Sequence, residues 1–250
     1  MLIVWSSKHL RKMKNSNFII LGSSGGIGSQ LVADLSSNHC NLLLGYNNDS
    51  PHIDYPIIKS AQVDCRSFDD TMSFIDECKS EVDHIHGIVS LPGSILLRPP
   101  HLVTELNFEE TINTNLKTAF SVMRAAGKLL SDSSVVLMST SAVSIGLANH
   151  EMIVAAKAGI ESMVKSASLT YAKKMLRFNA IAPGLVNTPL SSRIVNNPAA
   201  LEASIKMHST GRIGEPTDIS RMIYFLLDPD NNWITGQTFC VDGGLSSTKS

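Results

Sequence analysis

The sequence carries almost no net charge and no long hydrophobic run. Its 21 Lys and Arg residues offset 22 Asp and Glu residues, so the formal net charge is −1. Without a basic surplus there is no electrostatic reason to expect binding to nucleic acid or to an anionic membrane surface. No segment approaches the roughly eighteen consecutive apolar residues that a membrane-spanning helix needs. We therefore expect neither nucleic acid nor a membrane among its partners.

Cysteine is scarce, and no cysteine is close to another in the sequence. The four are Cys40, Cys65, Cys78 and Cys240, and no C-x-x-C pair is present. Disulfide frameworks and zinc sites need regularly spaced cysteines, whereas scattered free thiols are typical of reducing compartments. The spacing therefore predicts free thiols, no metal site and a cytoplasmic location.

The N-terminal segment is apolar only over its first few residues. Residues 1–5 are too few for a signal peptide, and the basic residues follow them instead of preceding them. We expect residues 1–14 to be a flexible tail outside the fold, with Met13 as an alternative start. Residues 15–250 contain no repeat or linker, and their number suits one α/β domain.

A strand pattern, a glycine-rich turn and a helical pattern follow one another between residues 18 and 35. Residues 18–21 are apolar with β-branched members, glycines stand at 22, 25, 26 and 28, and apolar residues then recur at helical spacing. A glycine turn between a strand and a helix lets a pyrophosphate approach bare backbone at the positive end of the helix. Because the flanking strand and helix supply the required context, we predict a dinucleotide site here.

Strand and helix patterns alternate along the rest of the chain. Strands are expected near residues 42–45, 59–63, 85–89, 135–138, 177–181 and 237–241. Helices are expected near residues 68–79, 108–128 (with Asn107 as N-cap), 150–173 and 216–227, and one short helix within the loop 188–212. This alternation predicts right-handed crossovers and a single-domain α/β fold with a doubly wound parallel sheet of the Rossmann type.

Six segments, in order, carry motifs of a known family. They are residues 21–28 (L-G-S-S-G-G-I-G), 88–93 (I-V-S-L-P-G), 115–116 (N-L), 179–184 with Thr188 (N-A-I-A-P-G…T), 211–219 (G-R-I-G-E-P-T-D-I) and 234–244. Over residues 16–245 the chain resembles the short-chain dehydrogenase/reductase family. Two matches are partial, since Leu21 replaces a threonine and only Gly93 survives of the family's N-N-A-G. The resemblance implies a homotetramer or dimer, and the small residues at 155–159 agree with close helix packing.

The resemblance implies cofactor contacts at three groups of residues. The pyrophosphate turn comprises Gly22, Ser24, Gly26, Ile27 and Gly28; the adenosine end comprises Tyr46, Asn47, Asp64 and Cys65; the nicotinamide end comprises Gly93, Lys157, Pro183, Gly184, Val186 and Thr188. Asp64 is expected to contact the adenine amino group. A carboxylate at position 46 would bind the ribose 2′-OH and repel a 2′-phosphate. Residues 46–48 offer neutral donors and no carboxylate, so NADP(H) is favoured over NAD(H), although no Arg or Lys stands ready there and Asp49 is close.

The same resemblance implies a catalytic set with one member missing. The candidates are Asn115, Thr140, Ser141, His150 and Lys157. In the family a Tyr four residues before the lysine exchanges the proton with the substrate. The spacing matters because positions i and i+4 share a helix face, which brings the lysine beside the Tyr. Ile153 stands there and has no proton to exchange. The hydroxyl position maps to Thr140, with Ser139 and Ser141 as neighbouring alternatives, and His150 fits the divergent pattern H-x-x-I-x-x-x-K.

Two functions are open at this point. Retention of Lys157 and Asn115 favours an NAD(P)(H)-dependent oxidoreductase that acts on a small-molecule carbonyl or alcohol with a non-standard proton donor. Ile153 and the altered residues 90–93 favour a catalytically inactive, dinucleotide-binding homologue with a sensing or scaffolding role.

Overall fold

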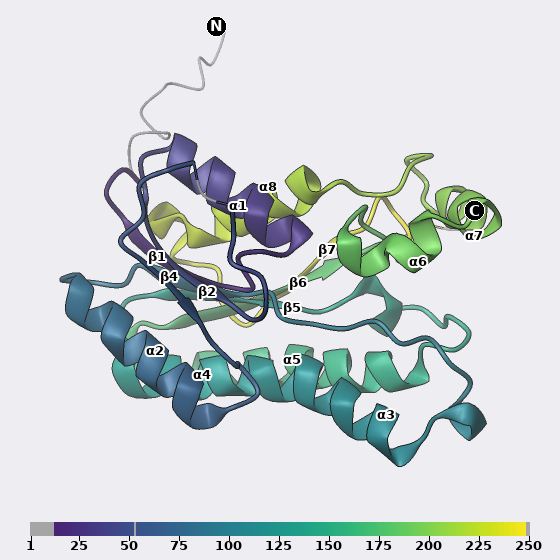
Figure 1. Ribbon diagram of the computed structural model, residues 1–250, viewed down its shortest axis with the longest axis horizontal. Coiled ribbons are helices and arrows are strands. Elements are labelled where there is room, and N and C mark those ends of the chain that lie inside the picture. The colour runs from purple at the N-terminus through teal and green to yellow at the C-terminus, as the bar shows by residue number, and fades with distance from the viewer. Residues whose placement is uncertain (1–12, 53, 249–250) are drawn as a thin grey trace, which may run out of the picture.

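A single parallel sheet forms the centre of the protein. The computed structural model describes residues 13–52 and 54–248. Seven strands lie in the order β3-β2-β1-β4-β5-β6-β7, and every neighbouring pair is parallel (Figure 1). The strands are β1 (Asn17–Leu21), β2 (Asn41–Tyr46), β3 (Lys59–Gln62), β4 (Gly87–Ser90), β5 (Ser134–Met138), β6 (Arg177–Pro183) and β7 (Thr238–Val241). The predicted Rossmann-type fold is therefore confirmed.

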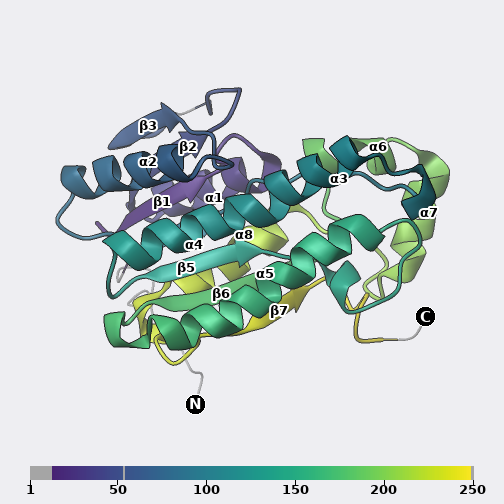
Figure 2. The same cartoon turned by 90° about the horizontal axis from the view of Figure 1, so that it is seen from below.

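Helices cover both faces of the sheet (Figure 2). One layer holds α1 (Gly26–Ser37) and α8 (Pro216–Leu227), which pack on each other, and the opposite layer holds α2 (Phe68–Glu81), α4 (Thr118–Leu129) and α5 (Glu151–Thr170). Three further helices, α3 (Glu105–Thr111), α6 (Ser192–Val195) and α7 (Pro198–Met207), lie toward the carboxyl ends of the strands. Those three helices surround the edge of the sheet where ligands bind in such folds.

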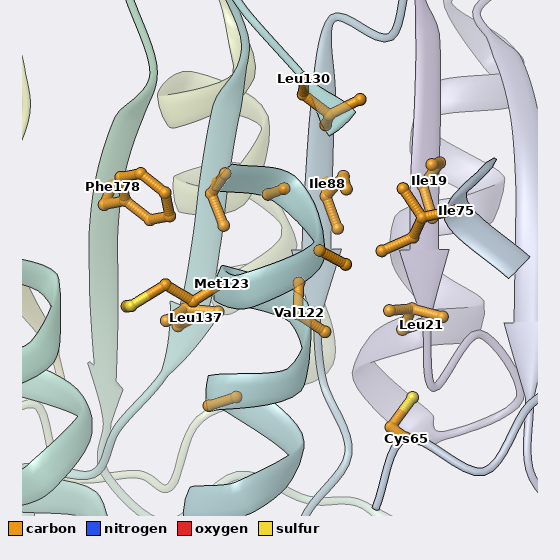
Figure 3. Close-up of a cluster of buried hydrophobic side chains, with 14 of the residues drawn as sticks. Ile19, Leu21, Cys65, Ile75, Ile88, Val122, Met123, Leu130, Leu137 and Phe178 are labelled. Carbon is orange, nitrogen blue, oxygen red and sulfur yellow. The ribbon is translucent and has the colours of Figure 1, made fainter. Parts of the chain in front are cut away.

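The strands β2, β1, β4, β5 and β6 contribute to two apolar cores, one under each helical layer. Ile19 and Leu21 belong to the core beneath α2, α4 and α5, whereas Phe18 and Ile20 belong to the core beneath α1 and α8. Figure 3 shows the first core, in which Val122 of α4 lies among the strand side chains. Because side chains alternate between the faces and both faces are covered, these central strands are mostly apolar along their whole length.

The helix expected from residue 108 begins earlier and is not continuous. The Thr104 hydroxyl accepts a hydrogen bond from the backbone N–H of Asn107 at 3.2 Å and caps α3. The prediction of Asn107 as N-cap was therefore wrong, because Asn107 already lies inside the first turn. Between α3 and α4 the chain forms a π-helical stretch, Ile112–Lys117, which carries Asn115. Such wide turns are frequent at functional sites.

Two other boundaries differ from the expectation. Met13 is fully buried, and its carbonyl accepts hydrogen bonds from the Ser16 N–H and the Cys40 thiol. The fold therefore includes residue 13, which the expected tail 1–14 had left out, while residues 1–12 lie outside the described part of the chain. The segment 188–212 contains two helices, α6 and α7, instead of one.

The four cysteines are unpaired, as their spacing predicts. In the part of the chain that the structure describes, no helix combines the length and the apolar character needed to cross a membrane.

Candidate active site

One cavity of about 890 Å³ lies at the carboxyl edge of the sheet. It spans the point where the strand order reverses between β1 and β4, which is the usual ligand position in open α/β sheets. All of the cofactor residues expected from the sequence line this cavity, from the glycine turn to Thr188. Of the expected catalytic residues, the cavity wall includes Asn115, Thr140, His150 and Lys157 but not Ser141.

The glycine turn brings bare backbone to the cavity. Gly22 has a φ of 81°, a conformation that favours glycine, and a Cβ on Gly28 would lie 2.2 Å from the Gly22 carbonyl oxygen. A Cβ on Gly26 would lie 2.9 Å from the Thr188 side chain. The N-terminus of α1 has no side-chain cap, so its first amides face the cavity wall without a competing acceptor. This cradle, which a side chain would fill, fits a pyrophosphate at a helix N-terminus.

The adenosine end contains an arginine that the sequence analysis missed. The cavity is lined by Tyr46 and Asn47, at the end of β2, and by Asp64 and Arg66, shortly after β3. The Arg66 Nε lies 2.9 Å from Asp64 Oδ1, and its Nη2 lies 2.9 Å from Oδ2. This bidentate pair holds the pKa of Asp64 below its usual value. The sequence analysis did not name Arg66, which the turn after β3 places in the wall of the same cavity as Tyr46.

Cys65, between those two charged residues, carries a neutral thiol. Burial raises its pKa to about 12. The side chain therefore serves as an apolar part of the wall and not as a nucleophile.

At the opposite end, Asn115 is held by the segment after β4. Its amide nitrogen donates to the Ser94 hydroxyl at 3.0 Å and to the Thr111 carbonyl at 3.0 Å, and its oxygen accepts from the Ser94 N–H at 3.2 Å. A Cβ on Gly93 would lie 3.1 Å from Asn115 Oδ1 and 3.7 Å from Lys157 Nζ. The absence of a side chain at Gly93 therefore lets the amide and the ammonium group approach one backbone position.

Lys157 is buried in the wall of the cavity without a carboxylate partner among the described residues. Its Nζ donates to the Met138 carbonyl at the end of β5, at 2.9 Å. Burial lowers the pKa of this lysine from 10.5 to about 8. An ammonium group has three N–H donors, and only one of them has a partner among the described residues. Two N–H groups are therefore left for a ligand.

The hydroxyl cluster after β5 divides between the cavity and the core. Thr140 lines the cavity, and its Oγ1 accepts a hydrogen bond from the Ala142 N–H at 3.4 Å, so its own proton is left for another acceptor. The fully buried Ser141 donates to the Ala182 carbonyl at 2.9 Å and does not line the cavity. Ser139 lines the cavity but donates to Glu161 at 2.5 Å. Thr140 is therefore the free hydroxyl, and the structure does not support Ser141 as a catalytic group.

His150 lies at the N-terminus of α5 on the cavity wall. Its Nδ1 is 2.8 Å from the Ala148 carbonyl, which only accepts, so Nδ1 carries the hydrogen. In the neutral ring Nε2 is then a proton acceptor. Only the doubly protonated ring can donate from Nε2.

His208 is a cavity residue that the sequence analysis did not identify. It is buried at the end of α7, with Nδ1 2.6 Å from the Ser204 carbonyl and Nε2 accepting the Leu185 N–H at 3.3 Å. A Cβ on Gly184 would lie 2.6 Å from this ring. Both ring nitrogens are occupied, so His208 ties α7 to the turn after β6 and takes no part in proton transfer. No sequence motif marks this contact.

The parallel sheet with a glycine turn at its switch point defines a Rossmann-type α/β protein. A family model described as enoyl-(acyl carrier protein) reductase matches residues 22–246, and the chain belongs to the short-chain dehydrogenase/reductase family. The members of this family are NAD(P)-binding oxidoreductases.

Several known proteins are similar over nearly the whole chain. A tropinone reductase homolog of Arabidopsis thaliana, described as chloroplastic, is 27% identical over 98% of this chain and 80% of its own length. A hydroxynaphthalene reductase-like protein of Metarhizium anisopliae is 24% identical over 94% of this chain and 96% of its own. A short-chain dehydrogenase/reductase from Mycobacterium ulcerans superposes with a TM-score of 0.88 at 21% identity, covering 96% of this chain and 92% of that one. ElxO, solved with NADP bound, superposes with a TM-score of 0.84 at 21% identity, covering 94% and 100%.

Proposed function

We propose that this protein is an NADP(H)-preferring oxidoreductase that interconverts a carbonyl and an alcohol with a non-standard proton donor. The observation that carries the proposal is the single cavity in which the glycine turn, Asn115, Thr140 and Lys157 meet. A scaffold would need the cradle for the nucleotide, but it has no chemical need for a lysine, an amide and a hydroxyl at the far end of the cavity.

The chain's own residues suit the cofactor. The turn at 22–28 would hold the pyrophosphate, Tyr46 and Arg66 would face the adenosine, and Lys157 would donate to the ribose beside the nicotinamide. When bound, NADP(H) supplies or accepts a hydride. The preference for NADP(H) is supported by the missing carboxylate at Tyr46 and by the guanidinium of Arg66 in the same wall.

Two groups suit proton exchange at the substrate oxygen. The Thr140 hydroxyl has its proton free and can donate a hydrogen bond to that oxygen. The Nε2 of the neutral His150 ring can accept a proton from an alcohol, and the imidazolium form can donate one to a carbonyl. We assign orientation of the substrate oxygen to Thr140 and proton exchange to His150.

The proposal extends to assembly and location. A homotetramer, or a dimer, is supported by family membership, although Gly159 packs on Leu116 of its own chain and so is not available for a contact between subunits. A cytoplasmic location is supported by the four free thiols. Light scattering on the purified protein measures the subunit number directly.

The test is a binding titration followed by turnover. NADPH fluorescence should show saturable binding to the wild type, and a panel of ketones should oxidise NADPH at rates that His150→Ala and Thr140→Ala reduce at least tenfold. Ser141→Ala is the matched control, because its hydroxyl lies outside the cavity. Absence of saturable binding at millimolar NADPH or NADH would overturn the proposal.

Ile153 favours a second candidate, a dinucleotide-binding homologue without turnover that senses cofactor or acts as a scaffold. It predicts the same saturable NADPH binding with no turnover of any ketone or alcohol in the panel. Binding with turnover therefore selects the enzyme, and binding without turnover selects the sensor.

A further inference from the structure

The cavity continues past the expected cofactor residues into a region walled by hydrocarbon, which we call the apolar lobe. We define it by Ile95, Leu147, Ile153, Leu190, Ile194 and Met207. These residues come from the segment after β4, from the start of α5 and from the α6–α7 region, which are separate in the sequence. Ile153 places this lobe at the reaction centre itself, because it stands four residues before Lys157 on the same helix.

Among the described residues, no Asp, Glu, Lys or Arg side chain is available to bind a charged group in the apolar lobe. The charged residues that line the cavity are Asp64 and Arg66, which pair with each other at the adenosine end, and Lys157, which donates to Met138. Of the cations on nearby segments, Arg98 donates to the Leu102 carbonyl and to Asn107, and Lys206 pairs with Glu202. Arg193, which precedes Ile194 on α6, does not line the cavity. An ammonium group in the lobe would lose water and gain no carboxylate partner, and an anion would find only His150, which the proposed function assigns to the substrate oxygen.

The polar groups around the lobe are few. Thr140 and Ser204 offer hydroxyls, both nitrogens of His208 are already bonded, and His150 keeps only Nε2 for a ligand, because its Nδ1 bonds the Ala148 carbonyl. A few neutral donors in a largely hydrocarbon wall orient one oxygen of a ligand and leave the rest of it to apolar contact.

The lobe also leaves apolar surface uncovered. Ile95, Leu190 and Met207 line the cavity but are 38%, 52% and 37% exposed. Covering such surface with a hydrocarbon ligand is favourable by roughly 25 cal/mol per Å². A polar substrate would leave this surface without a matching partner.

We propose that the substrate is an uncharged ketone or secondary alcohol whose hydrocarbon part fills the apolar lobe. This inference rests on the proposed function, because it names the substrate of that site. Keto acids, sugar phosphates and amino ketones are thereby excluded as substrates.

The test uses ketones of one shape and different charge. Benzophenone, 4-carboxybenzophenone and 4-(aminomethyl)benzophenone are titrated into the NADPH-saturated wild type, with binding followed by calorimetry and turnover by NADPH absorbance. We expect benzophenone to bind at least tenfold more tightly than either charged analogue. Equal or tighter binding of a charged analogue, or binding of none of the three up to the solubility limit, overturns the inference.

A charged variant of the wall gives a second, independent readout. Ile194→Lys should weaken benzophenone binding at least tenfold and bring the carboxylate analogue to equal or greater affinity. Leu169→Lys is the control, because Leu169 is 82% exposed on α5 and lies outside the cavity. Unchanged ligand ranking in a folded Ile194→Lys protein overturns the inference, and the wild-type series decides if that variant does not fold.

The proposed function and the proposed substrate class can be contradicted by different results. Wild type that does not bind NADPH contradicts the proposed function. Wild type that binds NADPH but prefers the charged ketones contradicts only the substrate class.

Discussion

Lys157 and Ile153 lie one turn apart on α5, and both line the same cavity. Lys157 donates to the Met138 carbonyl and is buried without a carboxylate partner among the described residues. Ile153 presents hydrocarbon at the position where the resemblance implies a tyrosine. On the proposed function, Lys157 therefore keeps its role toward the cofactor, and another group than Ile153 has to exchange the proton. Four predictions follow from this site and its surroundings.

Restoring the phenol should raise turnover. In Ile153→Tyr the hydroxyl would stand one turn before Lys157, where the ammonium group favours the phenolate. We expect NADPH oxidation with a neutral ketone to rise at least tenfold. Ile153→Phe is the control, since it adds the same ring without the hydroxyl. Equal rates for the Tyr and Phe variants would show that Lys157, Asn115 and Thr140 do not stand in a productive arrangement.

Replacing Lys157 with methionine should stabilise the fold at neutral pH. Because burial lowers the pKa of Lys157 from 10.5 to about 8, folding disfavours its charged form, and the free energy of unfolding of the wild type rises between pH 8 and 10.5. Lys157→Met removes this dependence and should be more stable than the wild type below pH 8, by up to about 3 kcal/mol. The difference should shrink toward pH 10.5 in urea unfolding.

Lys165→Met is the control for this comparison, because Lys165 is exposed on the same helix. A difference between Lys157→Met and the wild type that does not change with pH would contradict the assignment of a lowered pKa. We also expect Lys157→Met to bind NADPH less tightly, so stability and cofactor affinity should change in opposite directions.

Filling the cradle should abolish cofactor binding. A Cβ at Gly26 would lie 2.9 Å from the Thr188 side chain, and a branched valine would occupy the space that we assign to the pyrophosphate. We expect Gly26→Val to weaken NADPH binding at least a hundredfold in a fluorescence titration. Gly146→Val is the matched control, because a Cβ there meets nothing within 4 Å. Similar NADPH affinities for the two variants would place the pyrophosphate elsewhere.

A carboxylate at position 46 should reverse the cofactor preference. Tyr46→Asp would accept hydrogen bonds from the ribose 2′-OH of NADH and repel the 2′-phosphate of NADPH, a change of roughly 1–3 kcal/mol. We expect the ratio of the NADPH and NADH dissociation constants to shift at least tenfold toward NADH. Tyr46→Asn is the control, because it removes the tyrosine ring without adding a negative charge. A wild type that already binds NADH more tightly than NADPH would contradict the assignment.

Local sequence patterns were sufficient for the fold and for most of the cofactor wall. Apolar runs of strand length, helical periodicity and the glycine turn depend on residues close together in the chain, and the predicted sheet was confirmed. The cradle followed for the same reason, since Gly22, Gly26 and Gly28 belong to one turn. Ile153 and Lys157 could also be related from sequence, because helix geometry fixes which residues share a face.

Only the tertiary structure decided where side chains from different segments point. Ser141 turns into the core because the Ala182 carbonyl of β6 accepts its hydroxyl hydrogen, and Thr140 then remains as the free hydroxyl. Arg66 reaches the cavity because the turn after β3 brings it back against Asp64. The apolar lobe combines segments that are distant in the sequence. Hydrogen bonds and packing between such segments depend on the assembled sheet, so no local pattern in the sequence encodes them.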